Sequence, residues 1–158
     1  MIPLDEMYRE VILDHYKAPR GKKPLEHASV SADGHNPSCG DDIRLEIEMV
    51  NGILKNIHVD CKGCAISVAS GSMLAEAVKG KTFDEVRLMA DQIKKMIKGE
   101  TDVPEGDIGD LGALKGVRQF PVRIKCALLA WVTLIEGLNK YADGQTTGKV
   151  VMNGESDH

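Results

Sequence analysis

One stretch of strict alternation between apolar and polar residues constrains the fold more than any other part of the chain. From Ile43 to Met49 every second side chain is apolar, which is the period of a half-buried strand. Asn51-Gly52 follows, and this dipeptide favours a two-residue hairpin turn. We therefore expect a second strand to return antiparallel over residues 53–60. A further strand is expected over residues 27–34, which gives a sheet of three antiparallel strands.

The remaining periodic segments predict helices. An amphipathic helix is expected over residues 4–17, and a helix rich in small side chains over residues 65–79. Thr82 and Glu85 form a capping-box pattern that opens a helix ending near residue 98. A short helix is expected over residues 111–115, and Pro121 stands at the favoured first position of a last, long helix. The fold class is therefore α+β, a small antiparallel three-stranded sheet covered by about four to five helices.

The domain boundaries follow from the same patterns. Residues 1–142 are predicted to form a single domain, since a chain of 158 residues is long enough to bury one sizeable core. Residues 143–158 are polar and contain glycine, and we expect them to form a disordered tail.

Composition limits the compartment and the partners. The net charge of -4 argues against nucleic acid or an anionic membrane as the main partner. No uninterrupted apolar run is long enough to span a bilayer, and the first residues lack the basic and apolar regions of a signal peptide. A cytoplasmic location is expected. There the 4 cysteines are better suited to thiol chemistry or metal binding than to disulfides.

Three cysteines stand at predicted element boundaries, each beside residues that suit metal chemistry. Cys39 and Asp41 precede the first alternating strand and share its parity, so an extended chain would point both to one side. Cys64 precedes a helix, and Cys126 lies in the first turns of the last one. Together with Asp41 the three thiols make a set that suits tetrahedral zinc. The alternative is that they are unrelated buried thiols.

The last helix adds a positive charge to this set. Cys126 lies near the helix N-terminus, where the helix dipole stabilises a thiolate. Arg123 is three residues earlier on the same helical face, which places its guanidinium near the sulfur.

The same patterns separate other candidate ligands from this set. Cys61 and Cys64 form a CxxC pattern, which is typical of redox or zinc sites. However, Cys61 continues the apolar face of its strand and is predicted to be a packing residue, which leaves Cys64 as the working thiol. His15 lies on an apolar helical stripe, so a packing role is favoured over a ligand role. His58 is expected to point to solvent.

Three segments carry a resemblance to a known family, and they occur in the family's order. They are Asn36-Pro37-Ser38-Cys39-Gly40-Asp41, Gly63-Cys64-Ala65-Ile66-Ser67, and the segment from Phe120 to Trp131 that contains Lys125-Cys126. Residues 4–138 resemble the IscU/NifU-like iron–sulfur cluster assembly family, and its SufU branch in particular. The branch is indicated by Lys125, which stands where the IscU scaffolds have a histidine ligand, and by the replacement of their chaperone-binding segment. Cys61 stands where the family pattern has glycine and inherits no role.

The resemblance implies an IscU-type fold and a zinc-dependent sulfurtransferase. A pyridoxal-phosphate cysteine desulfurase of the SufS type would supply a persulfide, and Cys39 would accept its outer sulfur. The zinc ligands would be Cys39, Asp41, Cys64 and Cys126, and Arg123, Lys125 or Lys62 would offset the negative charge of the site. Asp41 is the hard ligand in a soft set and therefore the easiest to displace. The sulfur would pass to a downstream iron–sulfur scaffold or to apoproteins.

Two alternatives remain open at this point. The same ligands would also suit a scaffold on which an iron–sulfur cluster, of the 2Fe–2S type, is built and transferred. A zinc-stabilised binding module without catalysis is the second alternative. Whether the protein is an enzyme is not decided by the residues.

Overall fold

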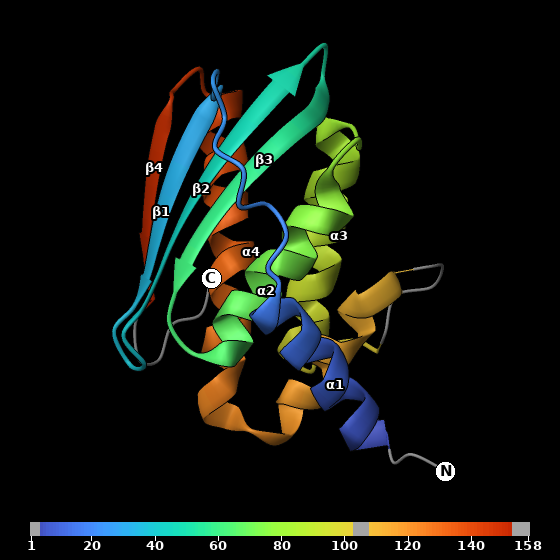
Figure 1. The fold of residues 1–158 in the computed structure, drawn as a ribbon. Helices are drawn as coiled ribbons and strands as arrows, with labels where there is room; N and C mark the ends of the chain where they lie inside the picture. The colour runs from blue at the N-terminus through green and yellow to red at the C-terminus, as the bar shows by residue number, and fades with distance from the viewer. Residues whose placement is uncertain (1–3, 103–107, 153–158) are drawn as a thin grey trace.

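Four strands form one mixed sheet in the order β3-β2-β1-β4 (Figure 1). The structure, a computed structural model, describes residues 4–102 and 108–152. The strand bounds are β1 (Val30–Asn36), β2 (Asp41–Val50), β3 (Ile53–Lys62) and β4 (Thr147–Val151). The β1–β2 and β2–β3 pairs are antiparallel, whereas β4 is parallel to β1. The predicted α+β class and its three antiparallel strands are confirmed, and the sheet has one strand more than predicted.

The fourth strand corrects the expectation of a disordered tail over residues 143–158. Thr147–Val151 pairs with β1, and the following Met152 is 1% exposed. The Met152 amide also donates to the carbonyl of His35. The tail prediction is therefore wrong for the paired residues, because their partner strand lies more than a hundred residues earlier in the chain. Residues 153–158, the end of that predicted tail, lie outside the described residues.

The hairpin between β2 and β3 forms at the predicted dipeptide. Asn51 and Gly52 have φ values of 52° and 78°, the left-handed conformation that a type I′ turn requires. Leu45 consequently lies opposite Val59. Both side chains are buried on the sheet face that the helices cover.

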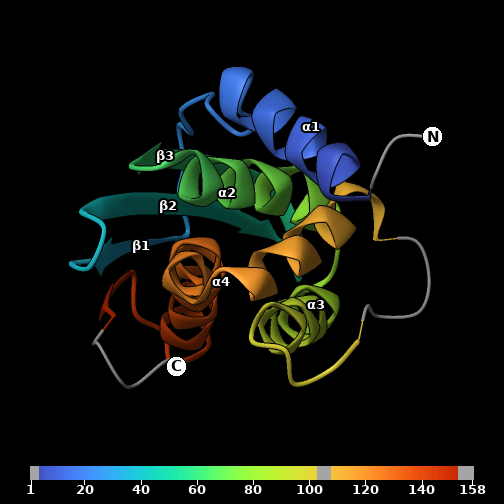
Figure 2. The same ribbon diagram turned by 90° about the horizontal axis from the view of Figure 1, so that it is seen from below.

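The helices lie on one face of the sheet (Figures 1 and 2). Their bounds are α1 (Leu4–Lys17), α2 (Ala65–Val78), α3 (Phe83–Ile97), the 3₁₀ helix η1 (Gly109–Gln119) and α4 (Pro121–Ala142). Helices α2 and α4 contact the sheet, and α1, α3 and η1 pack around them. The capping box of Thr82 and Glu85 and the proline at the start of α4 are confirmed. η1 is longer than the short helix predicted over residues 111–115.

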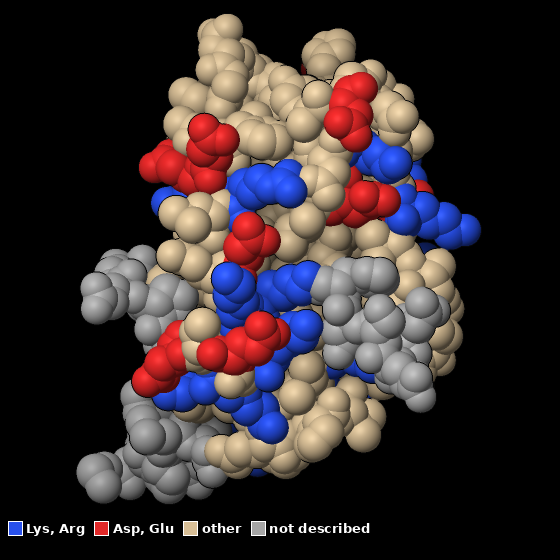
Figure 3. Space-filling model, turned by 180° about the vertical axis from the view of Figure 1, so that it is seen from behind, with Lys and Arg blue, Asp and Glu red and all other residues tan. Residues whose placement is uncertain are grey.

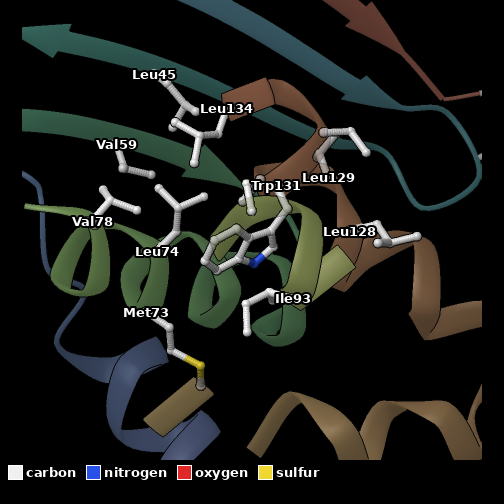
Figure 4. Packing of buried hydrophobic residues seen from close by; sticks show 14 of the residues in the cluster. Leu45, Val59, Met73, Leu74, Val78, Ile93, Leu128, Leu129, Trp131 and Leu134 are labelled. Atoms are coloured by element: carbon white, nitrogen blue, oxygen red, sulfur yellow. The ribbon is translucent and has the colours of Figure 1, made fainter. Parts of the chain in front are cut away.

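Trp131 joins the helices to the core. Its fully buried ring lies among apolar side chains of α2, α3 and α4 (Figure 4). The indole Nε1 donates to Ser70 Oγ at 3.1 Å, and the same hydroxyl donates to the carbonyl of Ala127 at 2.7 Å. One serine of α2 therefore connects to two residues of α4. Because buried polar groups need partners, this arrangement fixes how the two helices face each other.

The surface shows no single dominant charge on the face seen in Figure 3, where positive and negative side chains lie side by side. Among the described residues, Lys115 forms an ion pair with Asp102 and Lys98 forms one with Glu100. Within the described ranges, none of the helices has the length and apolar character that crossing a bilayer requires.

Candidate metal centre

Two of the predicted ligands lie where β1 turns into β2, Cys39 in the connecting loop and Asp41 at the start of β2. Asn36 and Asp41 are partners across the two strands, so the intervening residues form a tight turn. The amides of Cys39 and Gly40 both donate to the carbonyl of Asn36, at 3.3 and 2.9 Å. Gly40 has a φ of 70°, which favours glycine. As a result Asp41 is fully buried, whereas Cys39 is half-buried on the loop.

Cys126 meets this loop from the first turns of α4. Its Sγ is 3.2 Å from Cys39 Sγ. The two sulfur atoms and a carboxylate oxygen of Asp41 all lie within 4.8 Å of one another. Cys126 itself is fully buried. The structure therefore brings together three of the four predicted ligands in a space that suits one metal ion.

Cys64 lies beside this group at the N-cap of α2. Its backbone amide donates to Asp41 Oδ1 at 2.9 Å, and its Sγ is 3.6 Å from the hydroxyl of Ser67. Gly63 is required next to it, because a Cβ there would overlap Asp41 Oδ1. Cys64 thus contacts Asp41 through its backbone without belonging to the compact part of the group, and a movement of its side chain would complete a four-donor set.

The thiols of this cluster differ in their pKa values. A hydrogen bond from Cys126 lowers the pKa of Cys64 to about 5, so the Cys64 thiolate exists at neutral pH. The same hydrogen bond, together with burial and a second bond to Cys39, raises the pKa of Cys126. At Cys126 burial and these sulfur contacts therefore oppose the predicted effect of the helix dipole on the pKa. Cys126 is buried, and its thiol donates to the sulfur of Cys39.

Arg123 is exposed in the first turn of α4, three residues before Cys126. Its hydrogen bond with Cys126, and then the nearby charge of Cys64, raise the pKa of the guanidinium. This is the effect of anionic sulfur on a neighbouring cation. The cluster therefore has one permanent positive charge beside it.

Cys61 and His15 have the packing roles that the sequence predicts. Cys61 is half-buried against the core, and burial raises its pKa to about 11. His15 is fully buried, with Nδ1 2.7 Å from Ser72 Oγ and Nε2 2.8 Å from Asp110 Oδ2. Both ring nitrogens of His15 have partners within the protein. A ligand role for His15 would break one of these contacts.

His58 differs from its prediction. It was expected to point to solvent, but it is half-buried, and its Nδ1 has no hydrogen-bond partner in the described part of the chain. Its cross-strand partner Glu46 and the nearby Glu48 and Asn56 are also half-buried. Side chains in the middle of the outer sheet face therefore shield one another, which a simple in–out alternation does not predict.

Two polar residues of the site were not singled out by the sequence analysis. Asn36 is fully buried, and its amide lies near Asp41 and Cys126. Ser67 is buried one turn into α2, with its hydroxyl 3.6 Å from Cys64 Sγ. Asn36 belongs to a quoted motif, and the Asn-Pro dipeptide already indicates a turn. The role of its side chain depends on strand register and could not be read from the motif.

The donor set decides which metal fits. Three thiols with one carboxylate suit zinc, which prefers tetrahedral sulfur, nitrogen and oxygen donors. Magnesium and calcium require oxygen ligands, which a cysteine-rich set does not supply. Iron in an iron–sulfur cluster is also held by thiolates. The described residues therefore fit zinc or an iron–sulfur cluster.

Comparison with known proteins assigns the family. A family model described as the NifU-like N-terminal domain matches residues 7–147 of the chain. The chain belongs to this family. The matched range contains Cys39, Asp41, Cys64 and Cys126, so the NifU-like domain carries the entire candidate metal centre.

Relatives of the chain within the NifU-like family are named either as a sulfurtransferase or as scaffold proteins. The chain is 43% identical over 141 residues to the zinc-dependent sulfurtransferase SufU of Bacillus subtilis, covering 89% of this chain and 95% of the relative. It is 35% identical over 134 residues to the iron–sulfur cluster assembly scaffold protein IscU of Thermotoga maritima, covering 85% and 94%. The crystal structure of the N-terminal part of a nitrogen-fixing NifU-like protein from Brucella abortus superposes with a TM-score of 0.79 at 26% identity, covering 89% and 97%.

Proposed function

We propose that this protein is a zinc-dependent sulfur carrier in iron–sulfur cluster assembly. Cys39 accepts sulfur from a cysteine desulfurase, and Asp41, Cys64 and Cys126 hold the zinc ion together with Cys39. The observation that carries the proposal is the convergence of Cys39, Asp41 and Cys126 within 4.8 Å, with the Cys64 amide bonded to Asp41. The similarity to a relative named as a zinc-dependent sulfurtransferase supports the same function.

Burial and backbone contacts support different roles for these residues, although Cys39 and Cys64 are both half-buried. Asp41 and Cys126 are fully buried, and Cys64 is anchored by its backbone amide at the start of a helix. Cys39 lies on a turn beside Gly40 and is half-buried. It is therefore the thiol that an external donor reaches with the least movement of the chain.

The transfer itself is a thiol–persulfide exchange. The Cys39 thiolate attacks the outer sulfur of the donor persulfide, and one sulfur–sulfur bond forms as another breaks. The desulfurase leaves as a thiolate, and Cys39 becomes the persulfide, so no external oxidant or reductant is needed. When bound, zinc keeps its cysteine ligands deprotonated at neutral pH.

The net charge of the proposed site supports a role for Arg123 and a role for Asp41. Three thiolates and one carboxylate around a divalent cation leave a net formal charge of about minus two. The guanidinium of Arg123, bonded to Cys126 at the exposed edge, offsets part of this charge. Asp41 can leave the metal more easily than a thiolate, because a carboxylate is the hard ligand in an otherwise soft set.

A cluster scaffold is the second candidate function. The same donors can hold a 2Fe–2S cluster, and a relative named as a scaffold shares 35% identity. The residue before Cys126 weighs against this function, because Lys125 stands where the IscU scaffolds have a histidine ligand.

Two measurements test these functions against each other. Metal analysis of protein purified without air should find one equivalent of zinc and little iron or sulfide. Incubation with a SufS-type desulfurase and cysteine should accelerate alanine release and add about 32 Da, the mass of one sulfur atom, to the peptide containing Cys39. Iron and sulfide in the purified protein, without a persulfide on any cysteine, would favour the scaffold.

A further inference from the structure

The side chain of Asn36 is buried inside the metal centre, although it is not one of the predicted ligands. It is the last residue of β1 and the cross-strand partner of Asp41. Its exposed fraction is 0%, the same as that of Asp41 and Cys126. Burying a primary amide is costly unless its polar atoms find partners, so the contacts of Asn36 reveal what it does.

The amide oxygen of Asn36 shapes the loop that carries Cys39. Oδ1 accepts a hydrogen bond from the backbone amide of Ser38 at 3.2 Å, which forms an Asx turn. A backbone amide can only donate, so the side-chain atom that faces it must be the oxygen. This contact fixes the orientation of the carboxamide and directs its nitrogen to the other side.

The amide nitrogen faces two predicted ligands. Nδ2 is 3.4 Å from Asp41 Oδ2 and 3.9 Å from Cys126 Sγ. An NH₂ group has two hydrogens, and here each has one acceptor. The remaining oxygen of Asp41 accepts from the Cys64 amide at 2.9 Å. Both oxygens of the carboxylate are therefore held by neutral donors that add no charge to an already anionic site.

We propose that Asn36 is a positioning residue of the metal centre. Its nitrogen orients the carboxylate of Asp41 and the sulfur of Cys126 for metal binding, and its oxygen holds the turn that presents Cys39. The proposal rests on the proposed metal ligands but not on sulfur transfer. Groups of this kind, which contact ligands without binding the metal, typically contribute about 10- to 100-fold in metal affinity.

The substitution Asn36→Asp separates the two functions of the side chain. Aspartate has the same shape and keeps an oxygen for the Ser38 amide, so the turn can form. It replaces the donor by a second carboxylate facing Asp41. We expect zinc affinity, measured by competition with a chromogenic chelator, to fall about 10- to 100-fold. The cobalt-substituted protein should show altered ligand-field bands, because the geometry around the metal changes.

A matched control uses the same substitution elsewhere. Asn56 also donates to a carboxylate, that of Glu48 at 2.9 Å, but on the outer face of the sheet. Asn56→Asp should keep the zinc affinity and cobalt spectrum of the unmodified protein. Asn36→Ala, which removes donor and acceptor without adding charge, should also lose zinc affinity and should loosen the loop.

The outcomes are distinct. Wild-type zinc affinity and an unchanged cobalt spectrum in Asn36→Asp would overturn the proposal. So would circular dichroism showing both Asn36 variants unfolded without metal, since Asn36 would then serve the fold and not the site. A folded metal-free variant with weakened zinc binding supports it. If the unmodified protein bound zinc yet accepted no sulfur, the proposed function would fail while these measurements would stand.

Discussion

The sulfur atoms of Cys39 and Cys126 lie 3.2 Å apart, although 87 positions separate the two residues in the chain. This is too far for a disulfide bond and close enough for one proton or one metal ion to be shared. The contact joins a strand-connecting loop to the start of α4, so the state of these sulfur atoms links two distant parts of the fold.

Removal of Cys126 should eliminate most of the stabilisation that zinc provides. Metal affinity is partly folding free energy, and zinc at about 1,000 times its dissociation constant would stabilise the unmodified protein by about 4 kcal/mol. In Cys126→Ala the rise in Tm on adding zinc should nearly vanish. Cys61→Ala is the control, with full zinc content and a loss of only about 1 kcal/mol. A zinc-dependent Tm that survives in Cys126→Ala would refute the four-ligand site.

Removal of Cys39 should abolish sulfur acceptance, whereas removal of Asp41 should mainly lower zinc affinity. Cys39→Ala should abolish the persulfide adduct and the acceleration of alanine release, even where some zinc stays bound, because the accepting thiol is gone. Asp41→Ala keeps that thiol and should chiefly weaken the hold on zinc. Peptide mass spectrometry beside chelator competition separates the two effects. An adduct found on Cys64 or Cys126 would transfer the acceptor role to that residue.

Gly63→Ala should displace the carboxylate of Asp41. A methyl group at this position would overlap Asp41 Oδ1 and crowd Ser67 Oγ. We expect zinc affinity to fall by at least about tenfold, because the oriented oxygen ligand is lost. Gly112→Ala is a suitable control, since its added methyl would meet only Ile108 at an ordinary contact distance of 3.9 Å. Equal zinc affinities in the two variants would contradict the assigned position of Asp41.

The thiols of the metal-free protein should react with iodoacetamide at different pH values. Hydrogen bonding from Cys126 lowers the pKa of Cys64 to about 5, so Cys64 is a thiolate above that pH and a thiol below it. Its alkylation rate should be nearly constant from about pH 6 to about pH 8, whereas an ordinary thiol reacts about tenfold faster per pH unit over that range. Cys61, whose pKa burial raises to about 11, should stay almost unreactive. A steep rise in Cys64 labelling would argue against the shared proton.

Met152→Ala should destabilise the fold although it lies near the chain end. The side chain is 1% exposed and belongs to the core cluster. Removing a buried methionine costs about 2 to 5 kcal/mol. Urea unfolding would measure the loss, with Val151→Ala as a neighbouring control because Val151 is 43% exposed. Equal midpoints for the two variants would mean that the side chain of Met152 adds nothing to the stability of the core.

Patterns between neighbouring residues predicted the β2–β3 hairpin and the starts of two helices. The alternation through Ile43 and the Asn51-Gly52 turn specified the hairpin, and Thr82 and Pro121 specified where two helices begin. β4 escaped prediction because five residues pair with a strand far away in sequence and give no strong alternation of their own. The site was predicted as a set of residue types. Its proton sharing and the contacts of Asn36 depend on packing between strand ends and helix starts, which no local pattern contains.

The contact of Ser70 with Trp131 and Ala127 has a kinetic consequence for the metal centre. Cys64 and Cys126 stand at the starts of the two helices that Ser70 joins, so helix packing maintains the distance between their backbones. A metal ion that departs leaves this half of its binding site already assembled. The short turn carrying Cys39 and the side chain of Cys64 then have to reorganise when an ion arrives, so we expect metal exchange to be faster than global unfolding.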